Sequence, residues 1–119
     1  MKRPLKFRIW DNKVNRFTYF DIFSTFGRVP VDCEDNIQQF TGLLDKRGKE
    51  IYEGDIVRAP ANGARYIVKF GTYISRYGEN IEDLEHGFYI EGTFDPTDIE
   101  SMAESDQWLD VIGNIFEDR

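Results

Sequence analysis

Two glycine-containing turns within seventeen residues constrain the fold of this chain more than any other feature. The segment TGLLDKRGKEIYEGDIV, residues 41–57, places DKRG at 45–48 between two short runs, and Gly54-Asp55 directly before an apolar one. Glycine adopts positive φ without steric cost, and Asp side chains bond neighbouring backbone amides. We therefore expect Gly48, Gly54 and Asp55 to have structural roles in reversing the chain.

Short aromatic and β-branched runs continue this pattern along the chain, which holds 10 Phe, 6 Tyr and 2 Trp. Such residues favour pleated, half-buried strands. The predicted strands cover residues 5–10, 17–23, 37–44, 49–52, 64–73, 87–92 and 108–116, with a further strand beginning at Ile56. We expect Gly113, with Asn114, to break the last strand.

Three segments lack the period-two pattern. Residues 24–36 carry Gly27, Pro30 and an acidic step, which predicts a connecting loop, and the polar residues 75–86 predict a mobile loop. The sequence DPTD at 95–98 is typical of a helix start, with Asp95 as the cap and Pro96 in the first turn. We therefore expect one short helix from there.

These elements predict a mainly β (α+β) chain that forms a single domain over residues 1–119. Residues 1–36 would form an N-terminal β-hairpin and its connecting loop. Residues 37–119 would form a small, SH3-like, partly open β-barrel with one short helix, since tight curvature needs glycine corners.

The net charge of −7 is distributed unevenly. Residues 1–58 hold 11 basic and 9 acidic side chains, whereas residues 59–119 hold 4 basic and 13 acidic side chains. The acidic half disfavours nucleic-acid binding, because it would repel a phosphate backbone. The two halves could instead attract each other between copies, which makes a homo-oligomer possible.

Four blocks of the sequence resemble the YopX-like family of phage and prophage proteins. They are KFRIWD (6–11), QFTGLLDKRGKEIYEGDIV (39–57), GFYIEG (87–92) and DVIGNIFED (110–118). The resemblance implies a β-rich, phage-derived protein with a barrel like that of SH3 domains. It implies no established activity.

Aromatic side chains supply the main candidate binding surface. An aromatic groove is the device by which SH3-like barrels hold extended peptides, whereas basic side chains near the N-terminus are candidates for contacts with nucleic acid. The candidate binding residues are Tyr52, Phe70, Tyr73, Phe88, Tyr89, Lys6 and Arg8. Because a small barrel also needs large side chains inside, core packing is the competing interpretation for the aromatic residues.

The sequence contains no pattern that predicts catalysis. The only histidine, His86, ends the predicted 75–86 loop, and Cys33 lies among acidic residues that would raise the pKa of its thiol. Neither residue has an evident catalytic partner, and no phosphate loop, zinc spacing or EF-hand spacing is found. We expect no catalytic residues, no metal site and no cofactor.

The sequence therefore predicts a non-catalytic interaction module that binds a protein partner of host or phage. One cysteine and no long apolar segment favour a cytoplasmic location in a bacterial host, away from membranes. One alternative is a nucleic-acid-binding module that uses the basic N-terminal hairpin, with the cations Lys2, Arg3, Lys6, Arg8, Lys13 and Arg16. Another is an acidic decoy that occupies a DNA-binding protein of the host.

Overall fold

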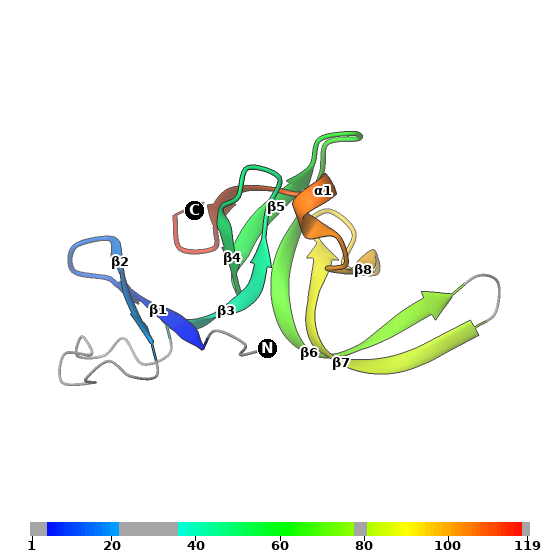
Figure 1. The fold of residues 1–119 in the computed structure, drawn as a ribbon, viewed down its shortest axis with the longest axis horizontal. Coiled ribbons are helices and arrows are strands. Elements are labelled where there is room, and N and C mark those ends of the chain that lie inside the picture. Colours follow the sequence, from blue (N-terminus) through cyan, green and yellow to red (C-terminus); the bar gives the residue numbers. More distant parts are fainter. Residues whose placement is uncertain (1–4, 22–35, 78–80, 118–119) are drawn as a thin grey trace.

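The computed structural model describes residues 5–21, 36–77 and 81–117 (Figure 1). The strands are β1 (Lys6–Asp11), β2 (Arg16–Asp21), β3 (Ile37–Leu44), β4 (Glu50–Tyr52), β5 (Asp55–Ala59), β6 (Ala64–Tyr77), β7 (Ile81–Gly92), β8 (Ile99–Ser101) and β9 (Asp110–Asn114). The helix α1 (Ser105–Trp108) has four residues, and no helix within these ranges is long and apolar enough to cross a membrane. The mainly β class is confirmed. The predicted 24–36 loop, except Asn36, lies outside the described residues, as does Cys33.

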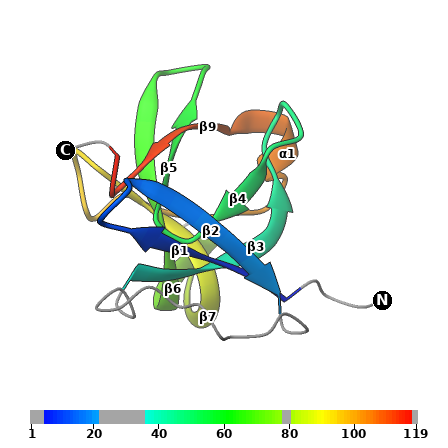
Figure 2. The ribbon, with the colours of Figure 1, turned by 90° about the vertical axis from the view of Figure 1, so that its left-hand side faces the viewer.

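The first sheet has the strand order β2-β1-β3-β4 (Figure 2). Strands β1 and β2 form the predicted N-terminal hairpin, paired from Lys6↔Asp21 to Asp11↔Arg16. Strand β3 pairs with the other side of β1, so the hairpin continues the sheet of the following strands.

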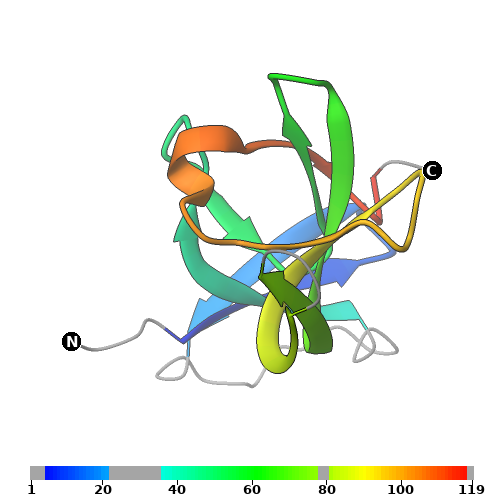
Figure 3. The same ribbon diagram turned by 90° about the vertical axis from the view of Figure 1, so that its right-hand side faces the viewer.

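The second sheet has the order β8-β7-β6-β5-β9 and curls into a half-barrel (Figure 3). After β8, the one-turn helix α1 brings the chain back so that its last strand pairs with β5. Side chains from this sheet, from β4 and from the segment around α1 form one buried cluster: Ile51, Val57, Ala59, Tyr66, Val68, Ile90, Met102, Leu109 and Val111. The concave side of the curled sheet therefore holds the core.

The prediction of a loop over residues 75–86 was wrong for residues 75–77 and 81–86, while residues 78–80 lie outside the described residues. Strands β6 and β7 pair continuously from Tyr66↔Gly92 to Tyr77↔Ile81, and together they form an arm that extends away from the body (Figure 1). Apolar residues at Ile74 and Leu84 lie directly opposite each other in this pairing, amid polar neighbours. Because acidic and polar residues dominate this segment, its composition indicates a loop although its apolar residues face each other in a hairpin.

The predicted helix start at Asp95 was also wrong. The Asp95 carboxylate accepts hydrogen bonds from the amide (3.0 Å) and the hydroxyl (2.6 Å) of Thr97, which makes a turn. The amide of Gly92 donates to the carbonyl of Asp98 (2.8 Å), and Ile99–Ser101 then pairs with β7 as β8. Residues that were expected to be helical are therefore part of a β-strand, and the helix begins later, at Ser105.

Gly113 is a strand residue and does not break the last strand. It pairs with Ile56, whereas Val111 pairs with Val57, so Ile112 forms a bulge in β9. The turn follows Asn114, whose side-chain oxygen accepts hydrogen bonds from the amides of residues 116 and 117 (2.9 and 3.1 Å). The expected irregularity is therefore present, but one residue earlier and inside the strand.

The turn between β3 and β4 is fastened to β9 by the buried Asp45. One carboxylate oxygen accepts the amides of Arg47 (2.8 Å) and Lys49 (2.9 Å), and the other accepts the amide of Val111 (2.9 Å). Burial opposes ionisation, but these hydrogen bonds and the Arg47 charge together outweigh it and lower the pKa of Asp45. The ionised carboxylate therefore ties the turn to the edge of the half-barrel.

We expect Asp45→Asn to lower the free energy of unfolding by about 1–3 kcal/mol at neutral pH, since an amide nitrogen cannot accept the hydrogen bonds that a carboxylate oxygen accepts. A lowered native pKa contributes stability above the unfolded value, near 3.8, and that stability is lost as pH falls through the lower native pKa. Urea unfolding from pH 7 down to about pH 2 should show that the difference in free energy of unfolding between wild type and Asp45→Asn becomes smaller in acid. The exposed Asp106→Asn variant is the control. A difference between wild type and Asp45→Asn that does not change with pH would contradict the stabilising role of the ionised Asp45 carboxylate.

Candidate functional site

Arg8 lies at the centre of a buried polar cluster that joins the two sheets. Its guanidinium donates to the carboxylate of Asp55 (2.6 Å) and to the side-chain oxygen of Gln38 (2.8 Å). The second oxygen of Asp55 accepts the amide of Tyr52 (2.8 Å). Arg8 is 4% exposed and Asp55 is 2% exposed, so the ion pair is shielded from water.

Aromatic rings enclose this guanidinium. Its central carbon lies 4.0 Å from the ring centre of Phe17 and 4.6 Å from that of Tyr52, within the range of cation–π attraction. The ring of Tyr52 also contacts those of Tyr19 and Phe40, at centroid distances of 5.6 and 5.4 Å. Burial, followed by the nearby Glu50 carboxylate, raises the pKa of the Tyr52 hydroxyl.

Tyr52 therefore does not line a surface groove and Arg8 is not exposed to an outside partner, contrary to what the sequence suggested. Both are buried parts of the link between the sheets. Burial is also the main influence on Asp55, and it raises the pKa of this carboxyl against the opposing effect of the Arg8 charge. Asp55 and Gly54 do lie at the predicted corner, with φ of +86° at Gly54, and Gly48 has φ of +80°. Lys6 is partly exposed and pairs with Glu50.

The other aromatic candidates lie on β6 and β7, on two opposite faces. Phe70 packs edge-on against Phe88 (4.8 Å between centroids) and His86 (5.1 Å), while Tyr73 stacks on Tyr89 (4.9 Å). Neighbouring residues in a strand point to opposite faces, which separates the two groups. Phe88 also packs against the core cluster, so the Phe70 group continues the core face onto the arm.

Apolar side chains remain uncovered beyond Phe88. Phe70 is 48% exposed, Ile74 is 44% exposed and Leu84 is 76% exposed. They share the face of the Phe70 group, because Phe70 pairs with Phe88 and Ile74 pairs with Leu84 in the register of the arm. The sequence singled out Phe70 but placed Ile74 before, and Leu84 within, a polar loop.

A cavity of about 340 Å³ lies beside the base of the arm. Its lining brings Phe70 and Tyr89 together with Ile37, Gln38 and Phe116, among others. Two of the predicted binding aromatics, from opposite faces of the arm, therefore both contribute to this lining. Tyr52 does not line this cavity. Residues of β3 and of the segment after β9 contribute to the lining.

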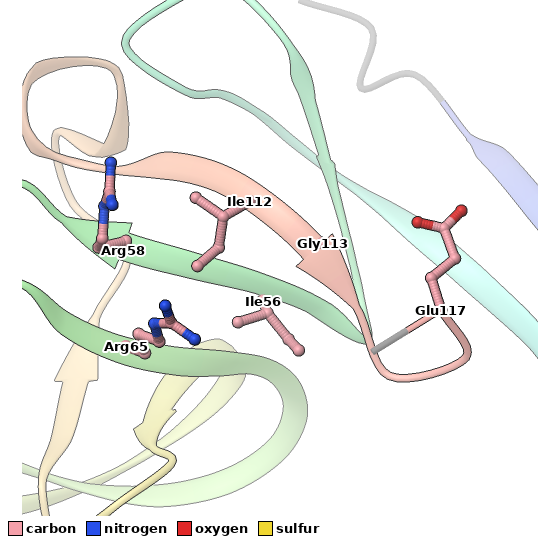
Figure 4. Close-up of a pocket in the computed structure, with 6 residues that line it drawn as sticks. All are labelled: Ile56, Arg58, Arg65, Ile112, Gly113 and Glu117. Carbon is pink, nitrogen blue, oxygen red and sulfur yellow. The ribbon is translucent and has the colours of Figure 1, made fainter. Parts of the chain in front are cut away.

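A second cavity, of about 370 Å³, was missed by sequence reasoning. Arg58 and Arg65 lie at one end of it, Ile56, Ile112 and Gly113 line it, and Glu117 lies at the other end (Figure 4). Arg58 on β5 pairs directly with Arg65 on β6. Arg58 and Arg65 lie at equal distances from the middle of the turn between the two strands. A hairpin at this point would pair them, and the sequence could have indicated this.

His86, the residue that the sequence considered for catalysis, lies on the arm. The Nδ1 atom of His86 lies 3.1 Å from the hydroxyl of Thr72 on the exposed arm. Within the ranges described, no three His, Cys, Asp or Glu side chains come close enough to hold a metal ion.

The molecule is thus a mainly β protein in which a curled sheet carries an extended hairpin arm. The chain belongs to the YopX protein family, whose model matches residues 21–119. The match begins at the end of β2, so the resemblance noted at residues 6–11 lies outside the matched region. A search of curated proteins finds no match to this chain.

Proposed function

We propose that this protein is a non-catalytic interaction module that binds protein partners, including a second copy of itself, through the apolar face of the arm. The exposed run of Phe70, Ile74 and Leu84 carries this proposal. An apolar face that continues from the core onto a protruding hairpin is typical of a surface that another chain covers.

The finer description of the fold belongs to the same proposal. Pairing of β5 with the final strand β9, and a one-turn helix before that strand, support an SH3-like, partly open barrel. Membership of the YopX protein family supports a phage or prophage origin and hence the cytoplasm of a bacterial host.

The charge-based alternatives have less support than the arm. Of the basic residues proposed to contact nucleic acid, Arg8 is buried against Asp55 and Lys6 pairs with Glu50. Lys2 and Arg3 lie outside the described residues. Two basic side chains of the N-terminal half are therefore already paired within the chain, which favours apolar contacts as the main source of association.

Sedimentation analysis tests the proposal. We expect wild-type protein to form an oligomer that persists as salt is raised, because apolar burial is not screened by ions. The double variant Ile74→Ser/Leu84→Ser should shift to monomer, since fully burying each aliphatic side chain contributes about 1.5–3 kcal/mol. Val14→Ser removes a half-exposed apolar side chain from the β1–β2 turn and should leave the oligomer intact.

A monomeric wild-type protein would contradict self-association. Affinity capture from infected and uninfected host cells then tests partner binding separately. A phage or host protein that is retained by wild type and by Val14→Ser, but lost by the arm variant, would support the wider proposal. Equal retention by all three proteins would refute the arm as the binding surface.

A further inference from the structure

The paired arginines of the second cavity form no ion pair with the residues that the structure describes. Arg58 and Arg65 are both exposed, and neither guanidinium lies within 4.0 Å of a carboxylate in the part of the chain that the structure describes. Asp110 pairs with Arg58 in the register of the sheet, but its carboxylate lies 3.7 Å from Arg47 instead. Among the described residues, the two arginines therefore line the cavity without an ion-pair partner.

This arrangement is unfavourable for the sheet by itself. Side chains that are directly opposite in an antiparallel pair lie close together, and like charges there destabilise the pairing. The backbone of Arg65 is held by Thr93, since the Arg65 carbonyl accepts the amide (3.0 Å) and the hydroxyl (3.3 Å) of Thr93. The strands thus place two basic residues side by side, where an added anion would relieve their repulsion.

The cavity supplies the remaining features of a small-ligand site. Its volume of about 370 Å³ lies at the lower end of the range for such sites. Ile112 and Ile56 form an apolar wall beside the arginines, and Glu117 stands at the far end, where it would repel a second negative charge (Figure 4). Guanidinium groups match the planar oxygen pairs of carboxylates and phosphates.

We propose that Arg58 and Arg65 bind the oxyanion of a small ligand, a carboxylate or a phosphate monoester, whose apolar part rests on Ile112. The site is on β5, β6 and β9, apart from the exposed residues of the arm, so it does not depend on the proposed mode of self-association. Its ligand has one compact anionic end, because Glu117 closes the opposite end to negative charge.

Calorimetric titration at low ionic strength tests this site with three probes: phenyl phosphate, phenylacetate and inorganic phosphate. We expect at least one of the two phenyl compounds to bind more tightly than inorganic phosphate. If phenyl phosphate binds more tightly than phenylacetate, the ligand is a phosphate ester, and the reverse order indicates a carboxylate. Each of Arg58→Gln and Arg65→Gln should weaken binding about ten-fold or more, as expected for loss of a charge-assisted hydrogen-bond pair. Lys13→Gln, which removes one exposed charge elsewhere, should leave affinity unchanged.

Thermal unfolding separates ligand binding from a role in folding. Without ligand, the two arginine variants should unfold at the wild-type temperature or above it, because a repulsion has been removed. The better probe should raise the wild-type midpoint and leave that of the double variant unchanged. The proposal is overturned if no probe binds at millimolar concentration, or if Lys13→Gln weakens binding as much as the arginine variants do.

Discussion

Replacing Asp55 with alanine should cost about 3–5 kcal/mol in the free energy of unfolding, because it leaves the buried Arg8 charge without its partner. Arg8 and Asp55 are almost fully shielded from solvent, and their closest atoms lie 2.6 Å apart. The change also removes the acceptor of the Tyr52 amide. Equilibrium urea unfolding of both proteins measures the difference.

An exposed pair provides the matched control. Lys69 and Glu91 lie 2.8 Å apart, but both side chains are partly exposed, so Glu91→Ala should cost no more than about 1 kcal/mol. Similar losses for Asp55→Ala and Glu91→Ala would contradict the assigned burial of the Arg8 pair.

A double variant distinguishes the ion pair from simple packing. Arg8→Met removes the charge but keeps an unbranched apolar stem between Phe17 and Tyr52. If the loss in Asp55→Ala comes from an unpaired charge, then Arg8→Met/Asp55→Ala should be less destabilised than the sum of the two single variants. Strict additivity would assign the loss to packing or to the Tyr52 amide.

Local sequence features predicted the parts of the fold that depend on neighbouring residues. The first hairpin alternates with period two, and the turn at Asp45 carries a glycine with positive φ, so both were readable from short segments. The arm was missed for a physical reason. The apolar pairs Phe70↔Phe88 and Ile74↔Leu84 form only when the two strands meet, and neither strand alone reveals its partner.

The functional interpretation of Arg8 failed for a related reason. Its partners Gln38 and Asp55 lie 30 and 47 positions away, on different strands. A basic residue near the N-terminus of a chain looks like surface charge until those partners are known. Arg58 and Arg65 show the converse, since they were unremarkable in sequence and become a candidate site only when β5 and β6 pair.

The two turn glycines should differ sharply when each is replaced by valine. Both have positive φ, which a β-branched residue adopts only with strain of about 1–3 kcal/mol. At Gly48 an added Cβ would meet no atom within 4 Å, so strain is the whole cost.

At Gly54 the same Cβ would lie 1.9 Å from the Nε2 atom of Gln38. Gln38 cannot move away without loss, because its Oε1 atom holds the Nε–H group of the buried Arg8 at 2.8 Å. An unsatisfied buried donor adds about 1–3 kcal/mol, so Gly54→Val should be destabilised by that much more than Gly48→Val. Thermal and urea unfolding of both variants measure the difference, and equal losses would show that Gln38 yields freely and that the polar cluster does not depend on glycine at this corner.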